Sequence, residues 1–274
     1  MELETITYQV AECVAHLTLS RPARTNALNG WMLEEINQAM DLAEQDANVR
    51  VVVVQGFGQA FSSGFDLKDQ MDVRPTGFDQ WKAVLRKDFD AVMRFWHCPK
   101  PTIAAVRGPC LAGAFELSMA CDMTIASETA FFGEPELKFG AGIVVMLLPW
   151  LVGPKVAKEI IFLGEDRLNV ERACELGLVN KIVPDGTLEM ETARVARHLC
   201  AVDPSLLKQT KRAINQTFER QGLLDALESA LAIDLDIEGP GSPDKIAFMD
   251  IARTNGLKAA LAWRDARFPA RANK

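Results

Sequence analysis

The chain has 274 residues, of which 49% are hydrophobic and 24% charged, as in an ordinary soluble protein with a substantial core. Its net charge of −7 has no compensating basic stripe, which argues against nucleic acid as a partner. The six cysteines show neither a CxxC pair nor metal-ligand spacing, so we expect buried thiols in a reducing compartment.

The hydropathy of the chain suggests neither a signal for export nor a membrane-spanning segment. The first ten residues are acidic and alternating, unlike a signal peptide. The longest apolar run, residues 141–152, is too short to span a bilayer and contains Pro149. We therefore expect a soluble cytoplasmic protein.

The first part of the chain predicts a hairpin, a helix and a covered strand. Residues 3–10 and 13–19 alternate apolar and polar positions, which indicates paired strands. An amphipathic helix is expected from Trp31, with Asn29 as its cap. The β-branched run 49–55 is typical of a strand that is buried on both faces.

The next part continues the alternation of strands and helices. A Gly- and Ser-rich loop is expected over 56–70 and a helix over 78–96. Short strands are expected at 102–106 and 122–126, with helical spacing from Leu111 to Ala120 between them. This order predicts an α/β fold with largely parallel sheets.

After Trp150 the chain becomes mainly helical. Helices are expected at 154–163 and 170–176, and one more strand at 178–183. Beyond Pro184 we expect only helices, with an acidic, Gly- and Pro-rich turn over 234–244; the helices are placed at 187–201, 204–220, 222–235, 242–254 and 256–264. Such a tail would cap the α/β body or bind a neighbouring subunit.

One short stretch stands out chemically. Gly113 lies where a helix should begin, and Glu116 follows one turn later in an otherwise apolar segment. Carboxylates are rarely placed in such surroundings unless they are paired, hydrogen-bonded or catalytic.

Five sequence blocks, taken in order and spacing, resemble the enoyl-CoA hydratase/isomerase (crotonase) superfamily. They are RPARTNALN (21–29), AFSSGFDLKD (60–69), PKPTIAAVRGPCLAGAFELSMACD (99–122), FFGEPELKFG (131–140) and ERACELGLVNKIVP (171–184). The resemblance implies a crotonase-like spiral of ββα units. It implies a core over 1–200 that binds a CoA thioester, and a helical region over 201–274 that caps the core and builds a homotrimer or homohexamer.

The resemblance also implies an oxyanion hole made by the backbone amides of Phe65 and Gly113. A thioester that becomes an enolate needs two donors aimed at its oxygen, and fixed N–H groups without counter-charge suit this role. Gly113 fits physically, because it allows close approach and lies at a helix N-terminus. Either Gly64 or Gly113 alone would be read as a turn glycine.

Glu116 and Glu136 match the two catalytic glutamates of the hydratases. We expect Glu136 to exchange a proton at the α-carbon and Glu116 to activate water, with their protonation states driven apart by burial. Such acid–base help is worth about 10²–10⁴ in rate. Glu116 could instead be a satisfied buried carboxylate, and Glu134 is a nearby competitor for Glu136.

The remaining implied contacts are to the CoA moiety. The loop 65–68 should follow the adenine and pantetheine through main-chain contacts, and Arg24 should lie near phosphate. The implied binding residues are Arg24, Ala27, Leu28, Ser63, Phe65, Asp66, Leu67, Lys68 and Gly113. No metal and no separate cofactor are expected, since coenzyme A is part of the acyl-CoA substrate.

Two positions and one segment depart from the family pattern. Phe65 stands where hydratases often have a small residue, and Arg107 replaces a frequent asparagine. The usual Gly-rich segment after the second glutamate is replaced by residues 140–153, which are apolar and expected to form a buried helix with a few pocket residues.

The resemblance leaves several functions open. Two glutamates favour hydration of a 2-enoyl-CoA, a lyase reaction, whereas an isomerase needs one carboxylate. A dehalogenase-like reaction would need an aspartate soon after Glu136, but no aspartate occurs between Asp122 and Asp166. A non-catalytic acyl-CoA-binding homologue is the alternative of a different class, and it should have lost one or both glutamates.

Overall fold

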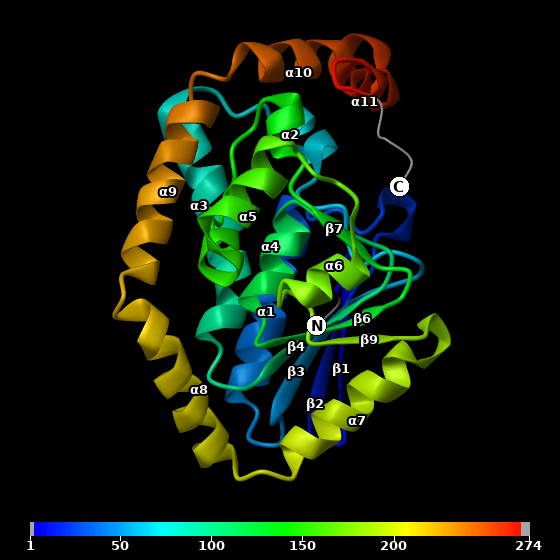
Figure 1. The fold of residues 1–274 in the computed structure, drawn as a ribbon, viewed down its shortest axis with the longest axis vertical. Helices are drawn as coiled ribbons and strands as arrows, with labels where there is room; N and C mark the ends of the chain where they lie inside the picture. Colours follow the sequence, from blue (N-terminus) through cyan, green and yellow to red (C-terminus); the bar gives the residue numbers. More distant parts are fainter. Residues whose placement is uncertain (1–2, 270–274) are drawn as a thin grey trace.

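The larger of two sheets lies inside the molecule, with helices on both faces. In the computed structural model, which describes residues 3–269, this sheet has the order β1-β2-β3-β4-β6-β9 (Figure 1). Neighbouring strands are parallel except for the hairpin at the edge. The strands are β1 (Ile6–Ala11), β2 (Val14–Leu19), β3 (Val51–Gly56), β4 (Thr102–Val106), β6 (Met123–Ser127) and β9 (Lys181–Val183).

Both faces of this sheet are covered, as the β-branched run predicted. Val52 and Val54 of β3 belong to the main core with α1 (Gly30–Gln45) and α3 (Gly77–His97). Val51 and Val53 point the other way, toward α7 (Leu188–Cys200). The period of two along the strand thus supplies two apolar layers from one run of valines.

A second sheet of three short strands was not predicted. It has the order β5-β7-β8, formed by β5 (Pro109–Leu111), β7 (Phe131–Gly133) and β8 (Leu168–Asn169). The expectation of helical structure from Leu111 is wrong at its start, because Leu111 ends β5 and α4 begins two residues later (Gly113–Ala120). Three-residue strands leave too short a pattern to be recognised from alternation.

The helices of the body follow the predicted order with one addition. Asn29 caps α1, accepting from the Met32 amide at 3.0 Å as expected. The region expected to be a loop up to residue 70 contains the start of α2 (Leu67–Val73), which Asp66 caps. The remaining elements of the body are the helix α5 (Leu148–Phe162) and the short helices α6 (Val170–Glu175), η1 (Pro22–Arg24), η2 (Glu136–Phe139) and η3 (Asp185–Thr187).

Four helices complete the described chain. As Figure 1 shows, α8 (Pro204–Glu219) and α9 (Leu223–Glu238) run along one side of the body, and α10 (Pro243–Asn255) and α11 (Leu257–Ala266) cross its top. The expected turn over 234–244 is wrong in its first half, because α9 continues to Glu238. The buried face of α9 extends from the leucines at 223, 227 and 231 to Asp234 and Glu238. These positions have helical spacing, but two of them are acidic, so the apolar pattern that predicts a helix ends too early.

Two sequence-level expectations can be compared with the described residues. The six cysteines are free thiols, with Cys98 and Cys110 buried. None of the helices within residues 3–269 combines the length and apolar character needed to cross a membrane.

Candidate active site

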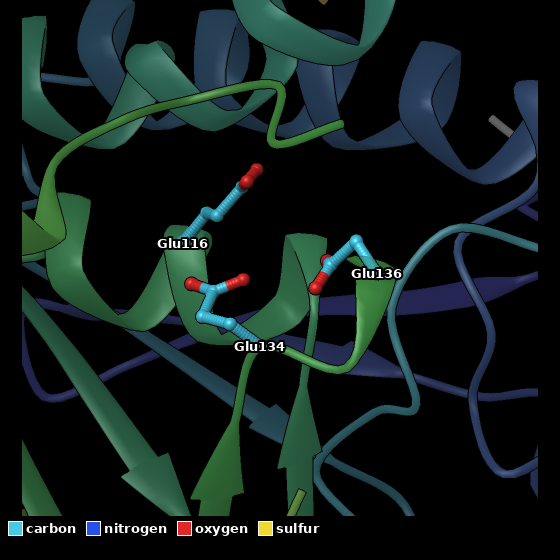
Figure 2. A group of neighbouring side chains, drawn as sticks. All are labelled: Glu116, Glu134 and Glu136. Carbon is cyan, nitrogen blue, oxygen red and sulfur yellow. The ribbon is translucent and has the colours of Figure 1, made fainter. Parts of the chain in front are cut away.

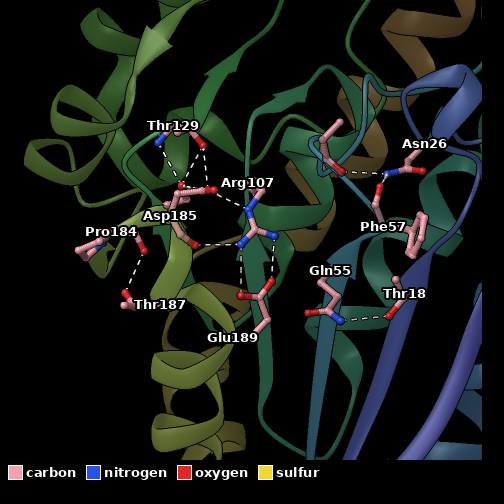
Figure 3. A network of polar contacts seen from close by, with 12 residues as sticks. Thr18, Asn26, Gln55, Phe57, Arg107, Thr129, Pro184, Asp185, Thr187 and Glu189 are labelled. Atoms are coloured by element: carbon pink, nitrogen blue, oxygen red, sulfur yellow. Dashed lines mark hydrogen bonds and ion pairs between the residues drawn. The ribbon is translucent and has the colours of Figure 1, made fainter.

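A buried asparagine joins the two loops that lead into the site. Asn26 is fully buried, and its amide donates to the carbonyls of Phe57 at 3.0 Å and Ala60 at 2.8 Å (Figure 3). Its side-chain oxygen accepts from the Arg21 amide at 2.9 Å. These bonds fix the loop 21–29 against the loop 56–66, so the two predicted CoA-contacting segments lie together.

Backbone hydrogen bonds continue this contact to Phe65. The Leu28 amide donates to the Gly64 carbonyl at 2.8 Å, and the Asp66 amide donates to the Leu28 carbonyl at 3.0 Å. Gly64 has φ +89°, and a Cβ there would lie 2.7 Å from the Leu111 carbonyl oxygen and 3.2 Å from the Gly113 nitrogen. Only glycine allows this approach, which places residue 65 next to the start of α4.

The start of α4 carries a strained backbone and a covered glycine. Ala112 has φ 55° and ψ −137°, which is unusual for a residue with a Cβ. A Cβ on Gly113 would lie 2.3 Å from Cε2 of Phe65, so the Phe65 ring rests on Gly113. Neither the Phe65 amide nor the Gly113 amide donates a hydrogen bond in the turns, loops and helix caps of residues 3–269.

Three glutamates converge beside these segments. Glu116 projects from α4, Glu134 follows β7 and Glu136 begins η2; Figure 2 shows the last two turning toward one another with Glu116 above them. One carboxylate oxygen from each lies within 4.8 Å of the others. Glu134, expected only as a competitor, is therefore a full member of the group.

The carboxylates of this group are left unsatisfied. Both oxygens of Glu116, both of Glu134 and Oε2 of Glu136 have no hydrogen-bond partner among the described residues. Buried polar atoms are normally paired, so such a concentration indicates a place for a water molecule or a ligand. The all-oxygen donor set would also suit a hard divalent cation.

Burial and mutual repulsion hold protons on this group. Burial raises the pKa of Glu116 well above its usual range, and the charge of Glu136 adds to the effect. Burial, followed by the charges of Glu136 and Glu116, raises the pKa of Glu134 in the same way. Burial raises the pKa of Glu136 to about 8. At neutral pH the group therefore holds protons that it can donate, and a carboxyl that has given up its proton becomes a base within the same cluster.

A cavity of about 470 Å³ reaches this group. Its wall contains most of the predicted site residues, namely Arg24, Ala27, Ser63, Phe65, Asp66, Leu67, Lys68 and Glu136. Leu28, Gly113 and Glu116 are buried next to wall residues. Within the described part of the chain they do not line the cavity themselves. Gly113 lies beneath the Phe65 ring, and Glu116 is only 1% exposed.

The far part of the wall comes from helices that sequence reasoning did not connect with the site. Trp81, Leu85 and Asp88 of α3 line it together with Asp234 and Glu238 of α9 and Lys245 of α10. Asp88 lies among the apolar positions of α3, the same kind of signal that singled out Glu116. Asp234 was hidden by its assignment to a turn.

The apolar segment 140–153 also reaches the cavity, although not as the expected continuous helix. Helix α5 begins only at Leu148 and is kinked at Gly153, which has φ 77°. Before it, Ala141, Gly142 and Val144 line the wall in non-helical structure. Gly142 lies so close to α9 that a Cβ would be 1.8 Å from Oδ1 of Asp234.

Arg107, the second departure from the family pattern, serves the scaffold. Its guanidinium donates to Oδ1 of Asp185 and to Oε1 of Glu189, each at 2.8 Å (Figure 3). Arg107 therefore ties the end of β4 to η3 and α7 and is not a wall residue of the cavity within the described chain.

Comparisons with known proteins agree with this architecture. The sequence profile of the enoyl-CoA hydratase/isomerase family matches residues 9–235. The crotonyl-CoA hydratase of Syntrophomonas wolfei is 31% identical, over 98% of this chain and 99% of its own. The short-chain-enoyl-CoA hydratase of Clostridium acetobutylicum is 32% identical, over 87% and 90%.

The similarity to one solved structure is higher than the similarity to these two relatives. A crystal structure of an enoyl-CoA hydratase/isomerase from Xanthobacter autotrophicus Py2 has a TM-score of 0.97 and 68% identity, covering 98% of this chain and all of that one. The mixed α/β architecture with two sheets and C-terminal helices is thus the crotonase fold. The chain belongs to the enoyl-CoA hydratase/isomerase (crotonase) superfamily.

Proposed function

We propose that this protein is an enoyl-CoA hydratase, which adds water across the double bond of a 2-enoyl-CoA thioester. The observation that carries the proposal is the convergence of Glu116 and Glu136 beside the touching segments of Phe65 and Gly113. The names of the relatives from Syntrophomonas wolfei and Clostridium acetobutylicum support the same reaction.

In the proposed reaction the thioester oxygen accepts from the amides of Phe65 and Gly113. These donors stabilise the enolate that forms when water adds to the β-carbon. Glu136, which lines the cavity, delivers the proton to the α-carbon, and Glu116 activates the water. Glu134 adds a third buried carboxyl, which favours proton sharing within the group.

The CoA moiety would occupy the part of the cavity lined by loops. Arg24 is exposed at the end of η1, and Lys68 is exposed at the start of α2. Both are wall residues, as is Arg264 of α11, and their charges suit the phosphates of CoA. Ala27, Leu28 and residues 65–68 would contact adenine and pantetheine mainly through the backbone.

A 2,3-enoyl-CoA isomerase is the second candidate, and one observation favours it. Of the three glutamates, Glu136 alone is in the described cavity wall, whereas Glu116 and Glu134 lie behind it. Double-bond migration requires a single carboxyl that removes a proton from one carbon and returns it to another.

A panel of matched 2-enoyl- and 3-enoyl-CoA esters tests both reactions, with loss or gain of the conjugated thioester absorbance as the readout. We expect hydration of the 2-enoyl esters, abolished by Glu116→Gln and by Glu136→Gln. Glu171→Gln, an exposed change on α6, is the matched control and should leave the rate unchanged.

The other outcomes would each reject hydration by a metal-free pair of glutamates. Migration of a 3-enoyl double bond that survives Glu116→Gln would identify an isomerase. Absence of turnover on every ester, with CoA esters still bound, would identify a non-catalytic binding protein. Activity that is lost on chelation and restored by a divalent cation would assign the three glutamates to a metal site.

We also propose that residues 1–200 form the catalytic core and that residues 201–274 cap it and build a homotrimer or homohexamer. Apolar side chains on α8 support an interface, since Leu206 is 60% and Ile214 is 56% exposed. Light scattering of the purified protein should give a multiple of three subunits, and Leu206→Glu with Ile214→Glu should reduce it. A monomer in the unaltered protein would contradict this assembly.

A further inference from the structure

The end of the cavity formed by α3, α9 and α10 is charged, although the acyl part of a simple fatty acyl-CoA is apolar. Asp88, Asp234, Glu238 and Lys245 all line the cavity and are at most 6% exposed. Burial raises the pKa of Asp88 to about 8, so at neutral pH Asp88 is largely protonated, and Asp234 and Glu238 supply two negative charges beside the one positive charge of Lys245. Buried charges of this kind are costly unless each has a partner.

Two of the four groups satisfy each other. Lys245 forms a close ion pair with Glu238, and its ammonium lies 4.1 Å from the centre of the Trp81 ring. The other oxygen of Glu238 accepts from the Gly142 amide at 3.2 Å. This arrangement leaves the positive charge largely committed to Glu238 and Trp81.

Asp234 is different, because it is buried and unpaired. It is 2% exposed, and neither of its carboxylate oxygens has a hydrogen-bond partner among the described residues. A Cβ on Gly142 would lie 1.8 Å from Oδ1, so only glycine lets the backbone of residue 142 pack this close to the carboxylate. Burial raises the pKa of Asp234 to about 6 while the charge of Lys245 opposes the rise, so an acceptor remains at neutral pH.

A ligand that complements this wall must donate a hydrogen bond. An alkyl end would bury Asp234 without a partner, and a carboxylate end would be repelled by the excess of negative charge. An alcohol or an ammonium group supplies the missing donor, and an ammonium group also balances the charge.

We propose that the cavity selects an acyl-CoA whose acyl group carries a hydrogen-bond donor, an alcohol or an ammonium group, which Asp234 accepts. This inference rests on the proposed function, because the acyl group must enter the cavity that Glu136 lines. It makes Asp234 a residue that determines specificity within that function.

Binding of saturated acyl-CoA esters tests the inference without requiring turnover. Four series of matched chain lengths, ending in methyl, hydroxyl, ammonium or carboxylate, are titrated calorimetrically. At the best length, the unaltered protein should bind a donor-ended ester about tenfold or more tightly than the methyl-ended one. The carboxylate-ended series should bind most weakly.

Variants at position 234 separate the role of this carboxylate from a general effect of cavity shape. Asp234→Leu and the smaller Asp234→Ala should both remove the preference for a donor. Asp234→Asn keeps an acceptor without charge, so it should retain a preference for the alcohol and lose one for the ammonium group. Asp236→Asn, an exposed change on the same helix, is the matched control. Far-ultraviolet circular dichroism confirms that each variant is folded.

The outcomes keep the inference separate from the proposed reaction. Equal or tighter binding of the methyl-ended esters at every length would overturn the inference, even if hydration occurs. A donor preference that survives Asp234→Leu and Asp234→Ala would overturn it too. A preference that depends on Asp234 in a protein that hydrates no ester would uphold the inference and reject the reaction.

Discussion

The two ends of the cavity differ in how their buried charged groups are compensated. Near Phe65, three buried glutamates lie together, and burial keeps protons on them. On the α9 side, Lys245 and Glu238 neutralise each other and Asp234 is left without a hydrogen-bond partner among the described residues. The first end is therefore suited to moving protons and the second to recognising a fixed polar group.

The largest expected effect would remove proton transfer at the glutamate end. Glu136→Gln keeps the shape of the side chain but cannot exchange a proton, so kcat should fall by about 10²–10⁴ with little change in KM. Steady-state kinetics on a 2-enoyl-CoA measures both constants. A rise in KM alone would show that Glu136 binds substrate rather than reacts.

The corresponding change at the α9 end should affect stability. Lys245→Met leaves Glu238 buried without its cation, so the free energy of unfolding should fall by about 3–5 kcal/mol. Denaturant unfolding measures the loss, and adding Glu238→Gln should restore part of it. Lys258→Met, an exposed change on α11, is the control. A loss equal to that of the control would mean that the buried pair is unimportant.

The oxyanion donors can be tested by removing one N–H group at constant bulk. In a Phe65→Ala background, which clears the ring from Gly113, both Gly113→Ala and Gly113→Pro add a Cβ, but only proline removes the amide donor. Proline is tolerated at the first position of a helix. The proline variant should have a kcat lower by about 10²–10³ than the alanine variant. Equal rates would exclude the Gly113 amide as a donor.

The glutamate end should also govern how stability changes between pH 4.5 and 8. The pKa of Glu136 is raised from its ordinary 4.5 to about 8, so the folded protein holds a proton that the unfolded chain has lost. The free energy of unfolding should therefore decline as pH rises from 4.5 toward 8. Glu136→Gln should flatten the decline measured by denaturant titration. An unchanged slope would mean that the group is not held protonated.

The smallest effect concerns the backbone that presents Gly113. Ala112 has φ 55°, and glycine relieves such strain at an entropic cost, so Ala112→Gly should stabilise the protein by about 1 kcal/mol. Thermal unfolding measures the shift. A lower melting temperature would show that packing of the Ala112 methyl group outweighs the strain.

Local patterns in the sequence predicted much of the fold. The hairpin of β1 and β2 shows the alternation of its strands, and α1 carries its own cap in Asn29. Helix α2 was missed because Asp66, its cap, lies in a stretch whose glycines and serines indicate a loop. Strands of two or three residues, such as β7 and β8, exist only through their partners in space.

The site residues also fall into two groups, those that a local sequence pattern identifies and those that only tertiary packing brings together. The glutamates and the two loops around Phe65 occur in blocks with recognisable order, so they could be singled out before the structure. Asp88, Asp234 and Lys245 meet only through the packing of three helices, and no spacing within any one helix indicates that meeting. Their common signal is a charged residue on a buried helical face, and it becomes specific only when the cavity is known.

Exchange of the α-proton isolates the step assigned to Glu136. The protein is incubated with a 3-hydroxyacyl-CoA product in deuterated water, and mass spectrometry follows deuterium at the α-carbon. The unaltered protein should incorporate deuterium, and Glu136→Gln should abolish the incorporation. Incorporation by Glu136→Gln at the unaltered rate would contradict the assignment of Glu136 and the reaction built on it.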